Sequence, residues 1–228
     1  MAQLYDRAAS VVRSIYDRRI DTPSVLDRDY YFPNAKRFTD NWRAIRDEAL
    51  AIALDQVPRF QDLLPAQEDI AGYDGRDWRV FVMKGYGFRL EHNLARCPFT
   101  ASILEQTPEA VSAIFAFLAP GKHIPKHRGP FRGILRFHLM LSMPNDENGM
   151  PACELNVDGV PHKLADGKSL LWDDTYPHEV WNRSDKVRVA LLLDVWRKGQ
   201  PADVALLSRA ILGATKLAFS MKGVDYQA

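Results

Sequence analysis

The sequence has little cysteine and no long apolar run. Only two cysteines occur in 228 residues, Cys97 and Cys153, and neither has the CxxC or Cys/His spacing of a metal site, so no disulfide framework is expected. No window reaches the eighteen or so continuous apolar residues of a membrane span. Charged residues also interrupt the first twenty positions, which argues against a signal peptide. We expect a protein of the reducing cytoplasm, with both cysteines acting as small buried apolar groups.

An excess of charge of either sign is also missing. Thirty Lys and Arg residues against 29 Asp and Glu residues give a formal net charge of +1. Such a balance gives no electrostatic reason to expect nucleic acid as a partner, so a small-molecule or peptide substrate is expected instead. With 46% hydrophobic residues, the chain can bury one substantial core but is short for two ordinary domains. We therefore expect one domain over residues 1–228.

Helical spacing of apolar residues marks the first part of the chain. Residues 2–19 place Leu4, Ala8, Val11, Val12, Ile15 and Tyr16 at intervals of three and four, which predicts an amphipathic helix. Its polar side carries both signs, which favours packing on its own domain over binding to a membrane surface. A second helix is predicted to begin near Thr39 or Asp40, either of which can cap it, and to run to about Ile52.

The middle of the chain changes to short strands. Apolar and β-branched runs lie at 78–83, 111–118, 133–143, 152–157, 168–172, 178–182 and 187–196, separated by Pro, Gly, Asn and Asp clusters. Strands at this spacing indicate a sandwich or barrel rather than a βαβ sheet. Helical spacing returns after Pro201. The predicted order is a helical part at 1–75, a β core at 76–197 and a C-terminal helix within 198–228.

The strand at 133–143 carries polar residues on one face. Alternation places Leu135 and Phe137 on one side and Arg136 and His138 on the other. Burying an arginine and a histidine costs free energy unless they have partners, so this face indicates an anionic ligand or a polar cavity. The alternative is an antiparallel sheet whose polar face meets solvent.

Two further histidines and an arginine could form a site. His127 lies in a Gly/Pro-rich loop at 120–130, and His178 follows a turn-like segment ten residues before Arg188. Two imidazoles from separate strand ends can meet at the mouth of a barrel, and neutral imidazole suits Fe(II) among other metals. Arg188 could bind a carboxylate of a chelating keto-diacid by a bidentate contact. His123, four residues before His127, is expected to be a loop residue.

Several motifs over 78–197 occur in the order of a known family. They are His127-Arg-Gly-Pro130, Leu135-Arg-Phe-His138, Trp172-Asp-Asp-Thr175, His178-Glu-Val-Trp-Asn182, Arg188 and Asp194-Val-Trp196. In these motifs the chain resembles the aspartyl/asparaginyl β-hydroxylases, which are Fe(II)- and 2-oxoglutarate-dependent oxygenases. Tyr86-Gly and Cys97-Pro-Phe-Thr100 look like the bacterial members. The resemblance implies a mainly β fold with flanking helices and a double-stranded β-helix (jelly roll, cupin-like) core.

The resemblance also implies roles for single residues. His127 and His178 would bind Fe(II), and Arg188 would pair with the distal carboxylate of 2-oxoglutarate. Arg136 and His138 would lie near the metal-chelating end of this cosubstrate. With O2, such a site hydroxylates an unactivated C–H bond, and ascorbate is expected to support turnover in vitro.

One position departs from the wider superfamily, in which a carboxylate commonly stands two residues after the first histidine. This chain has Gly129 there. Glycine cannot bind a metal, so water, an indirectly held ligand or a halide must fill the third position, and Asp174 is the candidate to hold such a water. Related iron halogenases admit chloride through the same glycine, so halogenation is an alternative.

A second departure is Ala116, where the family often has a serine that helps to bind the distal carboxylate. One hydroxyl contact is typically worth about 1 kcal/mol, so we expect weaker cosubstrate binding but not loss of activity.

The substrate stays open at this stage. The family offers peptidyl or free Asp or Asn, small natural products and lipid acyl chains; a missing membrane anchor disfavours the lipids. Lys126, Arg128 and Arg132 could attract an acidic substrate, although exposed loop cations are the simpler interpretation. Two further hypotheses are a non-catalytic jelly-roll binding protein and a cupin-type isomerase or dioxygenase that needs no 2-oxoglutarate.

Overall fold

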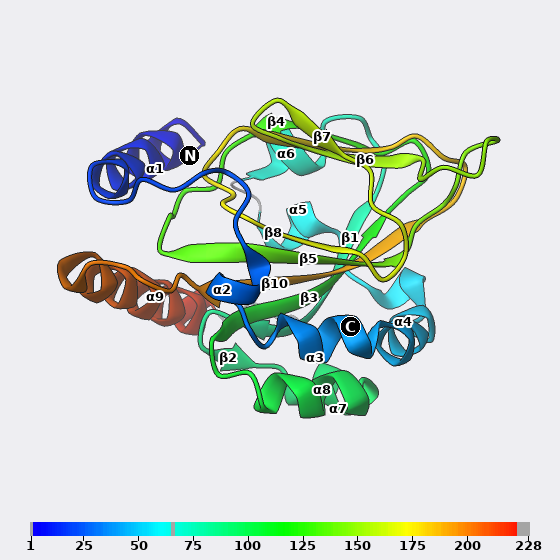
Figure 1. Ribbon diagram of the computed structural model, residues 1–228, viewed down its shortest axis with the longest axis horizontal. Helices are drawn as coiled ribbons and strands as arrows, with labels where there is room; N and C mark the ends of the chain where they lie inside the picture. The colour runs from blue at the N-terminus through cyan, green and yellow to red at the C-terminus, as the bar shows by residue number, and fades with distance from the viewer. Residues whose placement is uncertain (1, 65–66, 223–228) are drawn as a thin grey trace.

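Two antiparallel β-sheets lie one above the other in a computed structural model, which describes residues 2–64 and 67–222 (Figure 1). The large sheet has the strand order β2-β1-β3-β10-β5-β8, and the small sheet has the order β4-β9-β6-β7. The strands are β1 (Trp78–Gly85), β2 (Phe88–Arg89), β3 (Ala110–Leu118), β4 (His123–His127), β5 (Ile134–Ser142), β6 (Cys153–Val157), β7 (Val160–His162), β8 (Ser169–Trp172), β9 (His178–Asn182) and β10 (Arg188–Trp196).

The connections from β3 onward make a double-stranded β-helix. The chain passes from β3 in the large sheet to β4 in the small sheet, and then to β5, the β6-β7 hairpin, β8, β9 and β10 in alternation. The two sheets thus enclose one interior in a jelly roll. This topology confirms the predicted fold class.

Helices precede, interrupt and follow the strands. They are α1 (Ala2–Asp17), α2 (Arg28–Tyr31), α3 (Ala35–Asp40), α4 (Trp42–Leu50), the 3-10 helix η1 (Leu54–Gln56), α5 (Phe60–Leu63), α6 (Glu68–Ala71), α7 (Glu91–Arg96), α8 (Pro98–Glu105) and α9 (Ala202–Lys222). Within the described ranges, no helix has both the length and the apolar content required to cross a bilayer.

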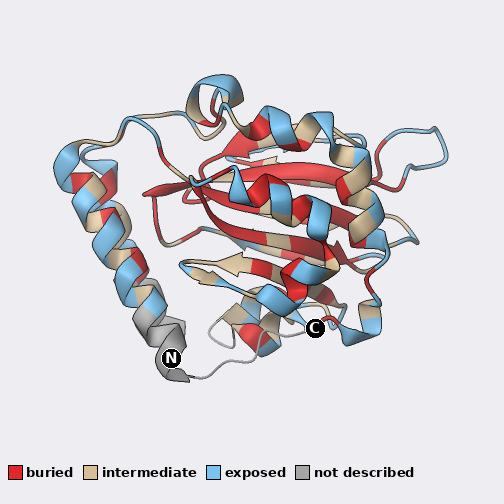
Figure 2. Ribbon diagram, turned by 90° about the horizontal axis from the view of Figure 1, so that it is seen from below, coloured by how far each residue is buried: buried red, intermediate tan, exposed pale blue. Residues whose placement is uncertain are grey.

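The outer face of the large sheet is buried under helices α3, α4, α7 and α8 (Figure 2). Phe32 and Phe38 pack against Phe137 of β5, with ring centroids 5.2 and 6.2 Å apart. The opposite face of β5, which carries His138, turns toward the interior between the sheets, where His138 is only 2% exposed. Because both faces of β5 are buried, the alternative that its polar face meets solvent is wrong.

The predicted first helix is α1, and it packs against α9. Tyr16 is fully buried, and its hydroxyl lies 3.0 Å from that of Ser208 on α9. Val11 and Ile15 remain exposed. The side chains of Leu4 and Ala8 lie outside the described part of the structure.

Two local predictions are wrong. Thr39 and Asp40 belong to the end of α3 and do not cap the next helix, whose N-cap is Asn41. The expected loop at 120–130 contains β4, an edge strand with a bulge between Ile124 and His127. A proline suggests a loop because it lacks an N–H, but Pro125 is accommodated at a sheet edge and bulge.

Candidate metal and carboxylate site

His127 and His178 face each other between neighbouring strands. His127 is the last residue of β4, His178 is the first residue of β9, and their Cα atoms are paired in the register. Their ring centroids are 4.0 Å apart. The fold thus brings together the two histidines that the sequence suggested as metal ligands.

Backbone carbonyl groups fix the tautomer of both rings. His127 Nδ1 lies 2.8 Å from the carbonyl oxygen of Pro125, and His178 Nδ1 lies 2.9 Å from that of Tyr176. A carbonyl oxygen only accepts hydrogen bonds, so each Nδ1 carries the proton and each Nε2 keeps a free lone pair. Burial lowers the pKa of His127 to about 4 and the pKa of His178 well below its ordinary value. Both rings are therefore neutral at pH 7, which is the form that binds metals.

Asp174 lies beside this pair. The residue is only 7% exposed, and burial raises the pKa of its carboxyl group to about 6. Arg136 holds the carboxylate through Nη2 at 3.3 Å, and the backbone N–H of Gly129 donates to the carbonyl oxygen of Asp174 at 2.6 Å. Across the described residues, no group of three or more His, Cys, Asp or Glu side chains could hold a metal ion. The site therefore contains two neutral imidazoles, with a carboxylate nearby.

Arg136 connects Asp174 to a second buried carboxylate. Its Nε donates to Asp194 Oδ1 at 3.0 Å, while Tyr86 and Ser112 donate to Asp194 Oδ2 at 2.6 and 2.8 Å. Burial and Asp194 raise the pKa of the Tyr86 hydroxyl well above its ordinary range, so it stays a donor. Sequence reasoning assigned no role to Asp194 or to its two other partners, Tyr86 and Ser112. The available signal was Asp194, an acid in the otherwise apolar run of β10.

Arg188 is a buried cation that has no carboxylate partner among the described residues. Its side chain is 3% exposed and contacts His138 Nε2 and the sulfur of Met140. Within the described part of the chain, its Nε and His138 Nδ1 are buried without a hydrogen-bond partner, and no acidic side chain forms an ion pair with Arg188. Burial lowers the pKa of Arg188 to about 10, which still leaves it charged at pH 7. A buried charge of this kind needs an anionic partner.

Ala116 lies on the same inner face of the large sheet. It is fully buried on β3 and paired with Ala190 of β10, two residues from Arg188. The residue in the place of the family's serine thus adds no polar group to the interior.

The loop cations differ from one another. Lys126 and Arg128 are exposed, as the simpler interpretation expected. Arg132 is only 5% exposed and donates to Asp173 at 2.8 Å and to Asp17 at 2.7 Å. The expectation of an exposed Arg132 is wrong, because Asp173 directly before Asp174 attracts it into the protein.

The remaining candidate residues have partners or are buried elsewhere. His123 is a strand residue rather than a loop residue: its ring stacks on Trp181 with 3.4 Å between centroids, and its Nε2 lies 3.3 Å from Glu179. Cys97 and Cys153 are buried free thiols, as expected, and burial raises the pKa of both.

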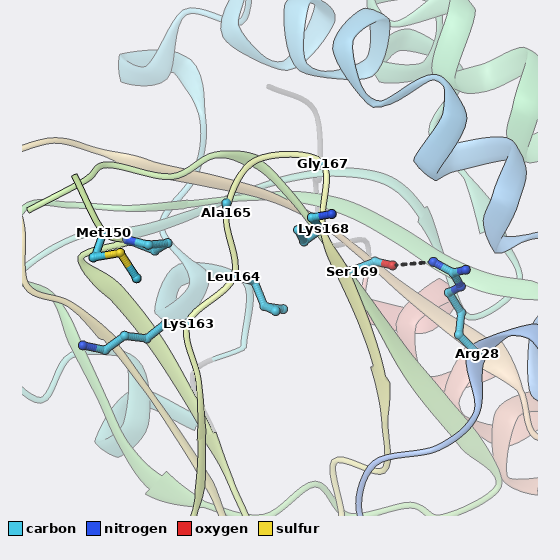
Figure 3. A pocket seen from close by; sticks show the side chains of 9 residues that line it. Arg28, Met150, Lys163, Leu164, Ala165, Gly167, Lys168 and Ser169 are labelled. Carbon is cyan, nitrogen blue, oxygen red and sulfur yellow. Dashed lines mark hydrogen bonds between the residues drawn. The ribbon is translucent and has the colours of Figure 1, made fainter.

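A groove of about 590 Å³ lies elsewhere on the surface (Figure 3). Its lining includes Arg28, Lys163 and Lys168 and reaches Ser169, the first residue of β8. Trp172, at the other end of β8, contacts His178. The groove is therefore separate from the histidine pair.

Comparison with known proteins gives one family. Residues 39–198 match the family model described as aspartyl/asparaginyl beta-hydroxylase. The chain is 36% identical over 178 residues to the ornithine lipid ester-linked acyl 2-hydroxylase of Rhizobium tropici, covering 77% of this chain and 61% of that protein. It is 30% identical over 171 residues to human aspartyl/asparaginyl beta-hydroxylase, covering 73% of this chain and 21% of the human protein. The chain thus spans about three fifths of one relative and one fifth of the other.

Solved structures with a related arrangement include cupins. A cupin domain from Bordetella pertussis has a TM-score of 0.29 and 17% identity, covering 37% of this chain and 79% of that one. A predicted oxalate decarboxylase from Thermotoga maritima has a TM-score of 0.32 and 13% identity, covering 41% and 72%.

Proposed function

Because the chain belongs to the aspartyl/asparaginyl β-hydroxylase family, we propose that it is an Fe(II)- and 2-oxoglutarate-dependent dioxygenase that hydroxylates an unactivated C–H bond. One observation carries this proposal: two neutral histidines with free Nε2 atoms share the interior of the jelly roll with Arg188, a buried cation for which the described residues provide no acidic partner.

The donor set fits the proposed metal and cosubstrate. His127 and His178 would hold Fe(II) through Nε2 and leave the other coordination positions for a chelating keto acid, oxygen and water. The bound iron and O2 would supply the oxidising power, whereas the protein binds and orients the reactants. Arg188 would take the distal carboxylate of 2-oxoglutarate, which would give its unpaired Nε an acceptor.

Arg136, His138 and Asp174 would serve the metal end of the site. No described residue is a hydrogen-bond partner of His138 Nδ1, so this atom is available to the cosubstrate. Asp174 would act through the proposed third position, by accepting a hydrogen bond from a water on the metal. Arg136 keeps the Asp174 carboxylate in place by the contact at 3.3 Å.

A lipid acyl chain is the second substrate class to test beside Asp- or Asn-like substrates. The observation in its favour is the 36% identity to a relative whose name specifies ester-linked acyl 2-hydroxylation. The human relative is named for aspartyl and asparaginyl residues. The two classes differ in the carbon attacked but need the same iron and keto-acid site.

The direct test is succinate formation from 2-oxoglutarate by the purified protein with Fe(II) and ascorbate. An Asp-containing peptide and an ornithine lipid are supplied in separate reactions, each with and without chloride. Succinate that depends on both Fe(II) and one substrate, with a hydroxylated product, is the expected result. A chlorinated product would instead indicate the halogenase alternative.

Two variants and a control make the test specific. His127→Ala and Arg188→Met are each expected to lower succinate formation at least a hundredfold. Arg59→Met removes a cation whose partner is a surface acid, Asp62, and should leave it unchanged. If 2-oxoglutarate failed to bind the Fe(II) protein in an anaerobic absorbance titration, the oxygenase proposal would be wrong. Binding without turnover on any substrate would favour a non-catalytic binding protein.

A further inference from the structure

Trp172 is a buried tryptophan whose indole N–H finds no acceptor among residues 2–64 and 67–222. It is 2% exposed and among the largest fully buried side chains of the described residues. No oxygen of the part of the chain that the structure describes accepts a hydrogen bond from its Nε1. An N–H group removed from water without an acceptor is destabilising, so a buried donor of this kind calls for an oxygen that a ligand can supply.

The position of Trp172 restricts which ligand can supply this oxygen. It is the last residue of β8, and its Cα is paired with that of Arg136 on β5. Its ring meets the ring of His178 edge-on, with centroids 4.6 Å apart and planes at 72°. Trp172 thus lies beside one proposed metal ligand and beside the arginine that holds Asp174.

Arg188 lies in a different part of the interior from Trp172. It contacts His138, whose Cα is paired with Leu170, two residues before Trp172 on β8. A long keto-diacid that has one end at Arg188 and the other at the histidines would bring its keto-acid end toward Trp172. Arg136 already pairs with two carboxylates, those of Asp174 and Asp194, so it has less capacity for a third.

We propose that the indole N–H of Trp172 donates a hydrogen bond to the carboxylate at the metal-chelating end of 2-oxoglutarate. This assignment rests on the proposed function. A carboxylate that binds a metal through one oxygen keeps lone pairs for donors from the protein. Trp172 is then a binding residue for the cosubstrate, in addition to its packing between the sheets with Val157 and Val180.

Trp172→Phe separates these two roles, because phenylalanine keeps an aromatic ring in the core and removes the N–H. Binding is measured anaerobically with the Fe(II) protein and two ligands, 2-oxoglutarate and succinate. Succinate keeps the distal carboxylate, but its other carboxylate stands at the position of the keto carbon, one carbon short of the metal-chelating carboxylate of 2-oxoglutarate. We expect the Kd for 2-oxoglutarate to rise about fivefold, as for the loss of one hydrogen bond, and the Kd for succinate to stay within twofold. Trp181→Phe, on the outer stack with His123, is the matched control and should change neither Kd.

A second measurement does not need the variant to fold. In the wild-type protein loaded with Zn(II), the indole ¹⁵N–¹H signal of Trp172 is expected to move downfield on addition of 2-oxoglutarate and not on addition of succinate. An unmoved signal, or an unchanged Kd in Trp172→Phe, overturns this assignment. If the wild type binds 2-oxoglutarate in the same experiment, the proposed function still holds. An equal loss for both ligands would place the donor at the distal carboxylate and also overturn it. Failure of the wild type to bind 2-oxoglutarate overturns both proposals.

Discussion

The carboxylate of Asp174 occupies the space that a side chain on residue 129 would need. A Cβ atom added to Gly129 would lie 2.3 to 2.5 Å from the carboxylate atoms of Asp174, which is far inside van der Waals contact. Many relatives in the wider superfamily place a carboxylate on the residue two positions after the first histidine. Here a carboxylate reaches the same region from the segment before the second histidine, so position 129 has room for glycine alone.

Gly129→Ala should therefore destabilise the metal-free protein by about 1–3 kcal/mol, as overpacking of a filled interior does. This steric clash is relieved only if the Asp174 carboxylate moves away from Arg136. The double variant Gly129→Ala with Asp174→Ala creates space for the new methyl group, and we expect it to cost less than the sum of the two single changes. Urea unfolding of the four proteins measures this coupling. Strict additivity would contradict the close packing of these two residues.

The fold could be predicted from the sequence because its interior strands carry regular patterns. The apolar runs of β3, β5 and β10 are buried on both faces or nearly so, and each was predicted. The two-residue strand β2 of the large sheet was not predicted, and neither were β4 and β7 of the small sheet. Both contain a proline, Pro125 or Pro161, and both lie at an edge of the small sheet, where a missing N–H costs little.

The candidate site was predictable only in part, for a related reason. His127, His178, Arg136 and Arg188 stand out as polar groups at strand ends or inside apolar strands. Ser112 is an ordinary small residue in sequence, and its role appears only when the register pairs it with Asp194. Contacts between distant segments of this kind leave no local pattern.

Ala116→Ser should tighten 2-oxoglutarate binding about fivefold, the equivalent of about 1 kcal/mol for one hydroxyl contact. Ala116 is fully buried on the inner face beside Ala190, so the new hydroxyl would face the interior. Ala113→Ser is the control, because Ala113 is equally buried on the outer face among the helices. Anaerobic titration of the Fe(II) proteins gives the Kd values. Unchanged or weaker binding in Ala116→Ser would mean that the hydroxyl does not reach the cosubstrate.

Asp173→Asn should lower the free energy of unfolding by about 3–5 kcal/mol, since breaking a buried ion pair leaves charge uncompensated. The Asp173 carboxylate is fully buried and binds Arg132 and Arg197, both of which are also buried. Asp62→Asn removes a carboxylate that pairs with Arg59 at the surface, and we expect a loss of at most about 1 kcal/mol. Urea unfolding of both variants makes the comparison. Similar losses of unfolding free energy in the two variants would show that the ion pairs of Asp173 with Arg132 and Arg197 stabilise the protein no more than a surface pair does.

Cys97 should not react with a thiol reagent at pH 8 while the protein is folded. Burial raises the pKa of its thiol from 9.0 to about 12, so the reactive thiolate is nearly absent at that pH. Because the folded-state pKa lies above the ordinary value, the stability gained from the neutral thiol is fully present below pH 9 and is lost as the pH rises toward 12. The Cys153→Ala variant isolates Cys97, and the reaction is followed by absorbance of the released thiolate with and without urea. Reaction in the folded variant as fast as in urea would contradict the burial of Cys97 beneath the large sheet.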